Sequence, residues 1–161
     1  MAGAHARVYL PLTPTLLRRA REDGGFEQPP LVAHAVTPAV VDELGNPDDE
    51  ESEYVALTAA ALESLALLRP DEPPRRVVAA VDVPAWEPRS GDEPADEPSA
   101  VSVPTRVPWR RVVAVHVDGE EASADVAAAL GGATEAVERC LDHELGWYAV
   151  QEIGPLVELE S

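Results

Sequence analysis

The chain of 161 residues carries 30 acidic and 12 basic side chains, which give it a net charge of −18, and all 12 basic residues are arginine. This length suits one domain, which would bury about 70% of the surface that its unfolded chain exposes. So negative a surface repels phosphate backbones and anionic lipid, and we therefore expect neither nucleic acid nor a membrane as a partner.

The absence of lysine has two open explanations. A GC-rich genome favours codons for Ala, Arg, Gly, Pro and Val, whereas a high-salt cytoplasm favours a surface covered with carboxylates. Many of the acidic residues are grouped in two segments rather than spread over the chain. This grouping favours the codon explanation.

The sequence predicts a soluble, cytoplasmic protein. Its single cysteine, Cys140, cannot form a disulfide within the chain, which fits a reducing compartment. Pro11 and Pro14 interrupt the apolar stretch that a signal peptide would need near the N-terminus. The most apolar segment, "ALTAAALESLALL", contains Glu63 and is far shorter than the roughly 20 residues of a membrane span.

The first 45 residues predict two similar units, each a strand followed by a Thr-Pro pair and a helix. The strands are "RVYLPLT" and "LVAHAVT", and the helices "TLLRRARED" and "AVVDEL" end at Gly24 and Gly45. This repetition predicts parallel strands joined by a crossover. The helix N-termini at Thr13 and Thr37 would then converge where small anions commonly bind, although helix capping alone is the simpler explanation of both threonines.

The segment "NPDDEESEYVALTAAALESLALLRP" gives the strongest helix signal. Asn46 is suited to cap the helix, Pro47 fits its first turn, and the carboxylates at 48–53 favour its positive end. Apolar residues recur at steps of three and four and predict one buried stripe. The stripe consists of Tyr54, Leu57, Ala61, Leu65 and Leu68.

The next segment predicts a long hairpin. The runs "RRVVAAVDV" and "WRRVVAVHVD" read as antiparallel strands. Between them, residues 84–100 form an acidic, proline-rich stretch that we expect to be a flexible loop, with Trp86 as almost its only large apolar residue.

Two helices and a strand complete the chain. The helices are "SADVAAAL", capped by Ser123, and "TEAVERCLDHEL", capped by Thr134 and ended by Gly146 in a left-handed conformation; the strand is "WYAVQEIGPL". Together these elements predict the α/β (α+β) class: a single domain over residues 1–161, with a mixed sheet of about five strands and helices packed on it.

The segment "DHELGWYAVQEI" holds the densest group of polar and aromatic residues. We expect His143 to lie in the last helical turn, Glu144 to point at the edge of the core, and Trp147 to anchor the final strand. A zincin would need a second histidine where Trp147 stands, and a site drawn from His34, His116 and Glu144 is less expected than ordinary hydrogen-bonded histidines. The candidate binding residues are Thr13, Thr37, His34, His143, Glu144, Trp147, Gln151 and Glu152.

The familiar catalytic motifs are absent from the sequence. It contains no G-x-S-x-G elbow, no Walker sequence and no G-x-G-x-x-G. Cys140 falls among apolar helix positions, which raise the pKa of a thiol. We therefore assign no catalytic residue, no metal ligand and no cofactor.

Four segments, "AHAVTP", "EYVALTAAALESL", "VAVHVD" and "DHELGWYAVQEI", together resemble a family of small acidic actinobacterial proteins of unknown function. The resemblance covers most of the chain except the proline-rich loop; it implies a high-GC bacterial cytoplasm and no particular chemistry. We expect a non-catalytic binding or protein-interaction module that takes a protein partner or a small anion. The alternative is a small enzyme with its polar groups around His143 and Glu144 at the sheet edge. A concave pocket at these residues would favour the enzyme, whereas a flat sheet edge would favour a protein partner.

Overall fold

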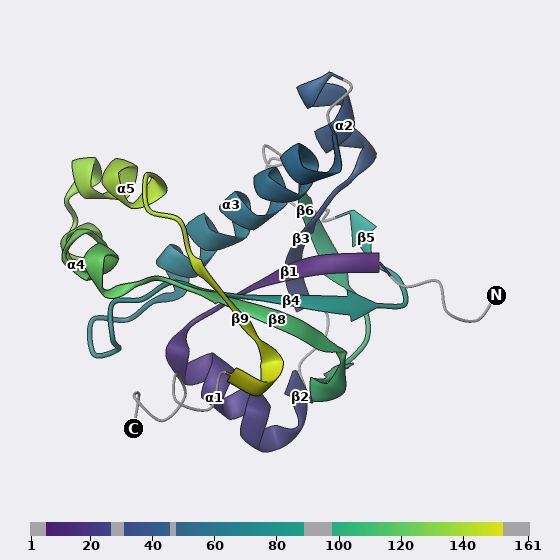
Figure 1. Ribbon diagram of the computed structural model, residues 1–161, viewed down its shortest axis with the longest axis horizontal. Coiled ribbons are helices and arrows are strands. Elements are labelled where there is room, and N and C mark those ends of the chain that lie inside the picture. Colours follow the sequence, from purple (N-terminus) through teal and green to yellow (C-terminus); the bar gives the residue numbers. More distant parts are fainter. Residues whose placement is uncertain (1–5, 27–30, 46–47, 89–97, 153–161) are drawn as a thin grey trace.

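A seven-stranded sheet forms the centre of the molecule (Figure 1). The computed structural model describes residues 6–26, 31–45, 48–88 and 98–152. In spatial order the strands are β5 (Glu87–Pro88), β6 (Ala100–Val103), β3 (Leu31–Ala35), β1 (Ala6–Leu12), β4 (Val77–Val83), β8 (Val112–Val117) and β9 (Gly146–Ala149). A second, two-stranded sheet pairs β2 (Gly25–Phe26) with β7 (Val107–Pro108).

All strand pairings among the described residues are antiparallel. The expected α+β domain, a sheet with helices packed on it, is confirmed, and so is the antiparallel pairing of β4 with β8. The expected parallel pairing of the first two long strands is wrong, because β1 pairs antiparallel with β3. A Thr-Pro pair marks where a helix begins, but it does not determine the direction in which the next strand returns.

Five helices surround the sheet: α1 (Pro14–Asp23), α2 (Pro38–Leu44), α3 (Asp49–Leu67), α4 (Ser123–Leu130) and α5 (Thr134–Leu141). Figure 1 shows α3 crossing one face of the sheet, while α1 and β2 lie on the other. Short 3-10 turns occupy Trp109–Arg111, Glu120–Ala122 and Val150–Glu152. None of the described helices is both long and apolar enough to cross a bilayer.

The strands bury a different set of side chains on each face. In β4, Val77, Ala79 and Val81 belong to the larger core, which α1 covers, whereas Val78 and Ala80 pack toward α3. This division follows from the alternation of side chains along a strand. The larger core is built mainly from the branched residues of β1, β4, β6 and β8.

The buried face of α3 differs from the predicted stripe. Leu65 and Ala61 are buried as expected, but Ala56, Ala60 and Ser64 complete the buried face. Tyr54, the first residue of the predicted stripe, is 54% exposed. Small residues allow the helix to lie close to the sheet, and this face carries too weak an apolar signal to be recognised by periodicity.

The predicted caps of α1 and α2 are confirmed. Oγ1 of Thr13 accepts a hydrogen bond from Leu16 N at 3.2 Å, and Oγ1 of Thr37 accepts one from Val40 N at 3.1 Å. Gly24 and Gly45 end these helices with positive φ angles of 80° and 70°.

The cap of α3 differs from the prediction. Asp48 caps α3 instead of Asn46, in a reciprocal capping box with Glu51. The predicted Asn46 and Pro47 lie outside the described residues.

Both ends of the predicted loop over residues 84–100 contact the rest of the fold. Trp86 packs against the larger core, and β5 pairs with β6. At the other end Ser99 is fully buried. Residues 89–97 lie outside the described part of the chain, and the flexibility of the loop stays a prediction.

The C-terminal segment corrects three expectations. Helix α5 ends at Leu141, and Gly146 is the first residue of β9, paired with Val117 and without a positive φ. Trp147 is 62% exposed, so it is not the buried anchor of this strand. The alternation of the strand turns Tyr148 toward the larger core instead, and Trp147 lies on the opposite face of this edge strand.

The two aromatic residues of β9 should therefore differ in their contribution to stability. We expect Tyr148→Ala to lower the free energy of unfolding by about 2 to 3 kcal/mol and Trp147→Ala by less than about 1 kcal/mol, because only Tyr148 packs against the larger core. Urea denaturation of both variants measures the difference. A larger loss for Trp147→Ala would contradict this packing.

Candidate functional site

A pocket of about 190 Å³ opens between α3, the end of the sheet and the segment that joins α5 to β9. It brings together three of the predicted binding residues, His143, Glu144 and Trp147. The other lining residues are Tyr54, Leu57, Thr58, Ala61, Arg76, His116, Leu141 and Leu145. The polar segment thus forms one wall of a concave site rather than a flat sheet edge.

The pairing of the strands determines which residues form the floor of this pocket. His116 of β8 lies opposite Val78 of β4 on one side and Trp147 of β9 on the other. Directly paired residues project on the same face of a sheet, so His116 and Trp147 are neighbours on the face that α3 partly covers. Trp147 and Tyr54, both more than half exposed, therefore lie at the rim.

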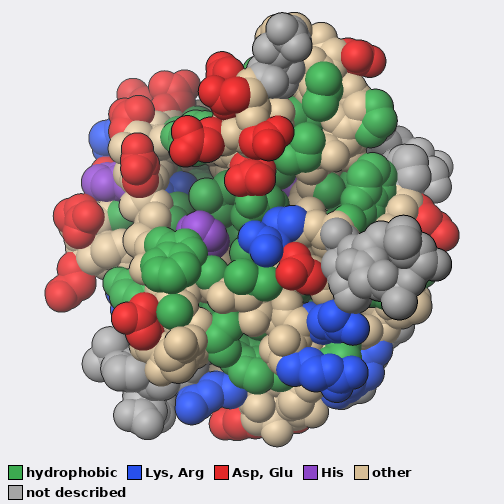
Figure 2. All heavy atoms as spheres, turned by 45° about the vertical axis from the view of Figure 1, so that its right-hand side comes forward, with side chains coloured by type: hydrophobic (Ala, Val, Ile, Leu, Met, Phe, Trp, Pro, Cys, Tyr) green, Lys and Arg blue, Asp and Glu red, His purple; other side chains and the backbone are tan. Residues whose placement is uncertain are grey.

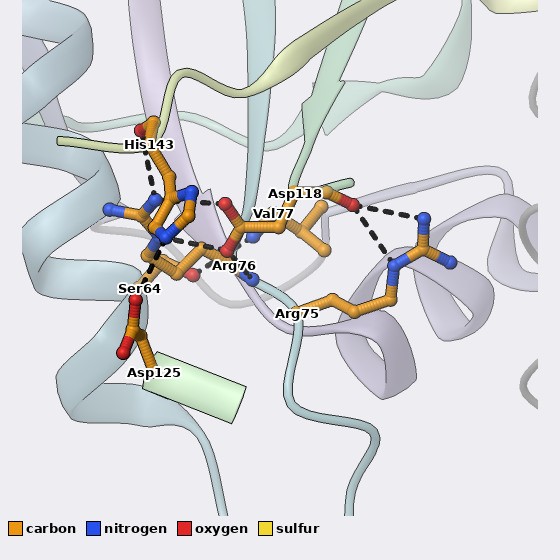
Figure 3. A network of polar contacts seen from close by, with 7 residues as sticks. All are labelled: Ser64, Arg75, Arg76, Val77, Asp118, Asp125 and His143. Atoms are coloured by element: carbon orange, nitrogen blue, oxygen red, sulfur yellow. Dashed lines mark hydrogen bonds and ion pairs between the residues drawn. The ribbon is translucent and has the colours of Figure 1, made fainter. Parts of the chain in front are cut away.

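A buried ion pair lies at the base of the pocket (Figure 3). Arg76 and Asp118 are 2% and 0% exposed. Nε and Nη2 of Arg76 each donate to one carboxylate oxygen of Asp118 at 2.8 Å, and the Arg76 main-chain N–H donates to the same carboxylate at 2.8 Å. The Asp118 carbonyl accepts hydrogen bonds from Nε and Nη2 of Arg75, at 3.1 and 2.9 Å.

The same guanidinium also holds the wall of the pocket. Nη2 of Arg76 donates its second hydrogen bond to the carbonyl oxygen of His143 at 3.1 Å. Three of the five N–H donors of Arg76 are thus engaged. The two donors on Nη1 have no partner among the described residues, and Figure 3 shows the third nitrogen pointing away from Asp118. Arg76 is itself one of the residues that line the pocket.

His116 supplies a second polar group. Burial lowers the pKa of its imidazole below 6.5, which keeps the ring neutral at pH 7. The ring lies 6.4 Å from that of Tyr9, centroid to centroid, and makes no hydrogen bond to another described residue. A neutral imidazole can donate or accept one hydrogen bond toward the pocket.

His143 lies two residues beyond the end of α5 at Leu141 rather than within its last turn, and its main-chain N–H donates to the Cys140 carbonyl at 3.1 Å. Its Nε2 lies 2.9 Å from Oδ2 of Asp125 in α4, and Arg139 Nε donates to Oδ1 of the same carboxylate at 2.7 Å. These hydrogen bonds, the one from Arg139 first, lower the pKa of Asp125. His143 therefore connects the pocket wall to α4, whereas Glu144 is exposed rather than turned toward the core.

The two capping threonines do not converge. Because β1 and β3 run antiparallel, Thr13 and Thr37 follow opposite ends of the sheet. Beside Thr13, desolvation acts to raise the pKa of Glu72, but hydrogen bonds from Thr15 and Thr13 and from backbone amides outweigh it and lower the pKa. The N-terminus of α1 thus already holds a carboxylate of the protein itself. Thr37 Oγ1 donates to the Pro98 carbonyl at 2.6 Å.

His34 belongs to a separate buried network. Its Nδ1 lies 2.8 Å from Ser99 Oγ and its Nε2 lies 2.6 Å from Glu63 Oε1. The order Ser-His-Glu is that of a catalytic triad, but His34 is 2% exposed and Ser99 fully buried, so a substrate cannot reach the hydroxyl. The network instead connects β3, the start of β6 and α3.

The remaining predicted site residues lie outside the pocket. Gln151 and Glu152 are exposed in the 3-10 turn after β9, where Glu152 Oε1 accepts a hydrogen bond from Ala149 N at 2.9 Å. Cys140 is buried as expected, and desolvation raises the pKa of its thiol. Within the described part of the chain, no group of three or more His, Cys, Asp or Glu side chains could hold a metal ion.

Sequence reasoning missed Arg76, Asp118 and His116 as site residues. The available signal was in "RRVVAAVDV" and "VAVHVD", where an arginine and an aspartate adjoin two antiparallel buried strands. Pairing those strands with Val77 opposite Val117 places Arg76 beside Asp118. The register needed for that step comes from tertiary structure.

The fold and the site define a class: an antiparallel α+β domain with a small pocket at one end of its sheet, based on a buried arginine. The chain belongs to the family described as "Family of unknown function (DUF6912)", which matches residues 6–157. Comparisons with curated proteins and with solved structures gave no match.

Removing one partner of the buried ion pair should be costly. We expect Asp118→Ala to lower the free energy of unfolding by about 3 to 5 kcal/mol, because it leaves the Arg76 charge buried and unpaired. The double variant Arg76→Met/Asp118→Leu should recover at least half of that loss. Urea denaturation measures both, and a double variant as unstable as Asp118→Ala would contradict the ion-pair explanation.

The lowered pKa of His116 predicts a pH dependence. The folded protein disfavours the proton that the unfolded chain accepts near pH 6.5, so this contribution to stability is complete above that pH and is lost as the pH falls toward the folded pKa. His116→Gln should therefore lose less stability than the wild type between pH 7.5 and 5, as measured by urea midpoints. Parallel pH profiles of the two proteins would disprove this assignment.

Proposed function

We propose that the protein is a non-catalytic binding protein of a high-GC bacterial cytoplasm and that its site is the pocket at the base of which Arg76 lies. The observation that carries this proposal is an arginine, Arg76, that is only 2% exposed, lines an apolar-walled pocket and keeps the donors of one nitrogen without a partner among the described residues. Binding sites commonly combine apolar walls with a few oriented polar groups. A protein partner would use the same site by inserting one side chain.

The lining of the pocket supports binding more than catalysis. His143 and Asp118, which could transfer protons, are already engaged with Asp125 and Arg76. Thr58 is the one serine, threonine or cysteine among the residues that line the pocket, and no partner activates its hydroxyl among the described residues. An activated nucleophile needs an adjacent base within hydrogen-bond distance.

A pocket-filling variant tests the proposal. Thr58 is half-buried on α3 and lines the pocket, whereas Ala66 is exposed on the same helix away from it. We expect ligand-observed NMR with a fragment library to find compounds that bind the wild type and Ala66→Leu but not Thr58→Leu. Fragments that bind all three proteins equally, or no bound fragment at all, would overturn the proposal.

A small enzyme is the second candidate, favoured by the neutral imidazole of His116 and the exposed carboxylate of Glu144 at the same pocket. These groups would act as a base and an acid on a bound molecule. Mass spectrometry of each bound fragment after prolonged incubation separates the two candidates. A product formed by the wild type and not by His116→Gln would identify an enzyme.

A further inference from the structure

We propose that the ligand of this pocket is an uncharged molecule with one planar ring and a carbonyl-type oxygen, which accepts a hydrogen bond from Nη1 of Arg76. This inference rests on the proposed function, because it specifies the chemistry of a ligand in the same pocket. It follows from three properties of the site: its size, its polarity and its charge.

The size of the pocket limits the ligand to one ring. Its volume is about 190 Å³. A protein cavity of roughly 150 Å³ is large enough to bind benzene. The additional volume suits a substituent of a few atoms, whereas a fused-ring system or a nucleotide would extend beyond the pocket.

The walls favour a flat, apolar body. Leu57 and Ala61 of α3 line the pocket together with Leu141 and Leu145. Trp147 adds a largely exposed indole at the rim. Aromatic side chains contact other rings by offset stacking or edge-to-face packing, so an aromatic ring gains more here than a branched aliphatic group.

Arg76 determines the polar end of the ligand. Its side chain is held by two hydrogen bonds to Asp118 and one to the His143 carbonyl, so Nη1 has a fixed position before any ligand binds. A ligand that displaces water from this donor loses affinity unless it reproduces the hydrogen bond. A ligand oxygen directed at Nη1 would satisfy that donor, and a pure hydrocarbon would not.

The charge of the site favours a neutral acceptor over an anion. The carboxylate of Asp118 balances the guanidinium of Arg76. Glu144 lies in the lining, and Glu53 precedes Tyr54 at the rim. Figure 2 shows acidic side chains gathered beside hydrophobic surface on one face of a molecule whose net charge is −18. The negative electrostatic potential of these carboxylates would repel a negatively charged ligand.

Three probes of similar size separate these properties. Benzamide carries the ring and a neutral carbonyl, benzoate carries a charged acceptor, and toluene carries the ring alone. We expect NMR titrations of the wild type at low salt to give benzamide a dissociation constant about tenfold lower than that of toluene, since a hydrogen bond to a charged group contributes more than one between neutral groups. Benzoate should bind more weakly than benzamide.

The double variant Arg76→Met/Asp118→Leu tests the role of Nη1. It removes the donor and keeps apolar volume, so its dissociation constants for benzamide and toluene should be similar to each other, and the preference for benzamide should be lost. Ala66→Leu is the matched control and should keep that preference. Equal binding of benzamide and toluene by the wild type, tighter binding of benzoate, binding of none of the three, or a preference that survives in the double variant would each overturn the inference. If the three probes fail but other fragments bind the wild type and not Thr58→Leu, then the proposed ligand class is wrong and the proposed function still stands.

Discussion

The ion pair of Arg76 and Asp118 is the interaction on which the rest of the site depends. The carboxylate accepts hydrogen bonds from the main-chain N–H and the guanidinium of Arg76, and the guanidinium in turn donates one to the carbonyl oxygen of His143. Three segments far apart in the sequence, at residues 76, 118 and 143, are therefore held at one point. An apolar pair of equal volume would fill the same space, but it would not fix the carbonyl from which the chain enters β9. Buried ion pairs add little net stability compared with apolar packing, so the role of this pair is to fix the relative positions of the three segments.

The pocket exists because one helix covers only part of a wide sheet. Ala56 and Ala60 bring α3 close to Tyr9 and Ala80 over the central strands. Beyond Ala80 the same face continues through His116 to Trp147 on the edge strand. The segment between α5 and β9 closes this end of the sheet and leaves a space bounded by both helix and strand residues. Trp147 on the edge strand and Tyr54 on α3 remain more than half exposed because neither is covered by the other layer at this end of the sheet.

Features determined by neighbouring residues could be predicted from the sequence, and features determined by distant contacts could not. The caps at Thr13 and Thr37 and the ends at Gly24 and Gly45 depend on a few adjacent residues and were predicted correctly. The direction of β3 relative to β1 and the pairing of residues 76 and 118 depend on tertiary structure. Gly146 was misread because Gly after a helix-like run is typical of a C-terminal cap, whereas α5 ends already at Leu141. The segment that the sequence singled out lines the pocket through His143, Glu144 and Trp147, whereas Arg76, which lines the same pocket, was not predicted as a candidate.

The two buried polar networks show why Arg76 is a stronger functional candidate than His34. Both ring nitrogens of His34 lie within hydrogen-bond distance of Ser99 or Glu63, so this network is complete without a ligand. Arg76 is equally buried, yet it lines the pocket, and the two donors on Nη1 have no partner among the described residues. A ligand that enters must replace the water that solvates such a donor, and it gains affinity only if it reproduces the hydrogen bond. The donor therefore makes the pocket selective for a ligand with an oxygen acceptor.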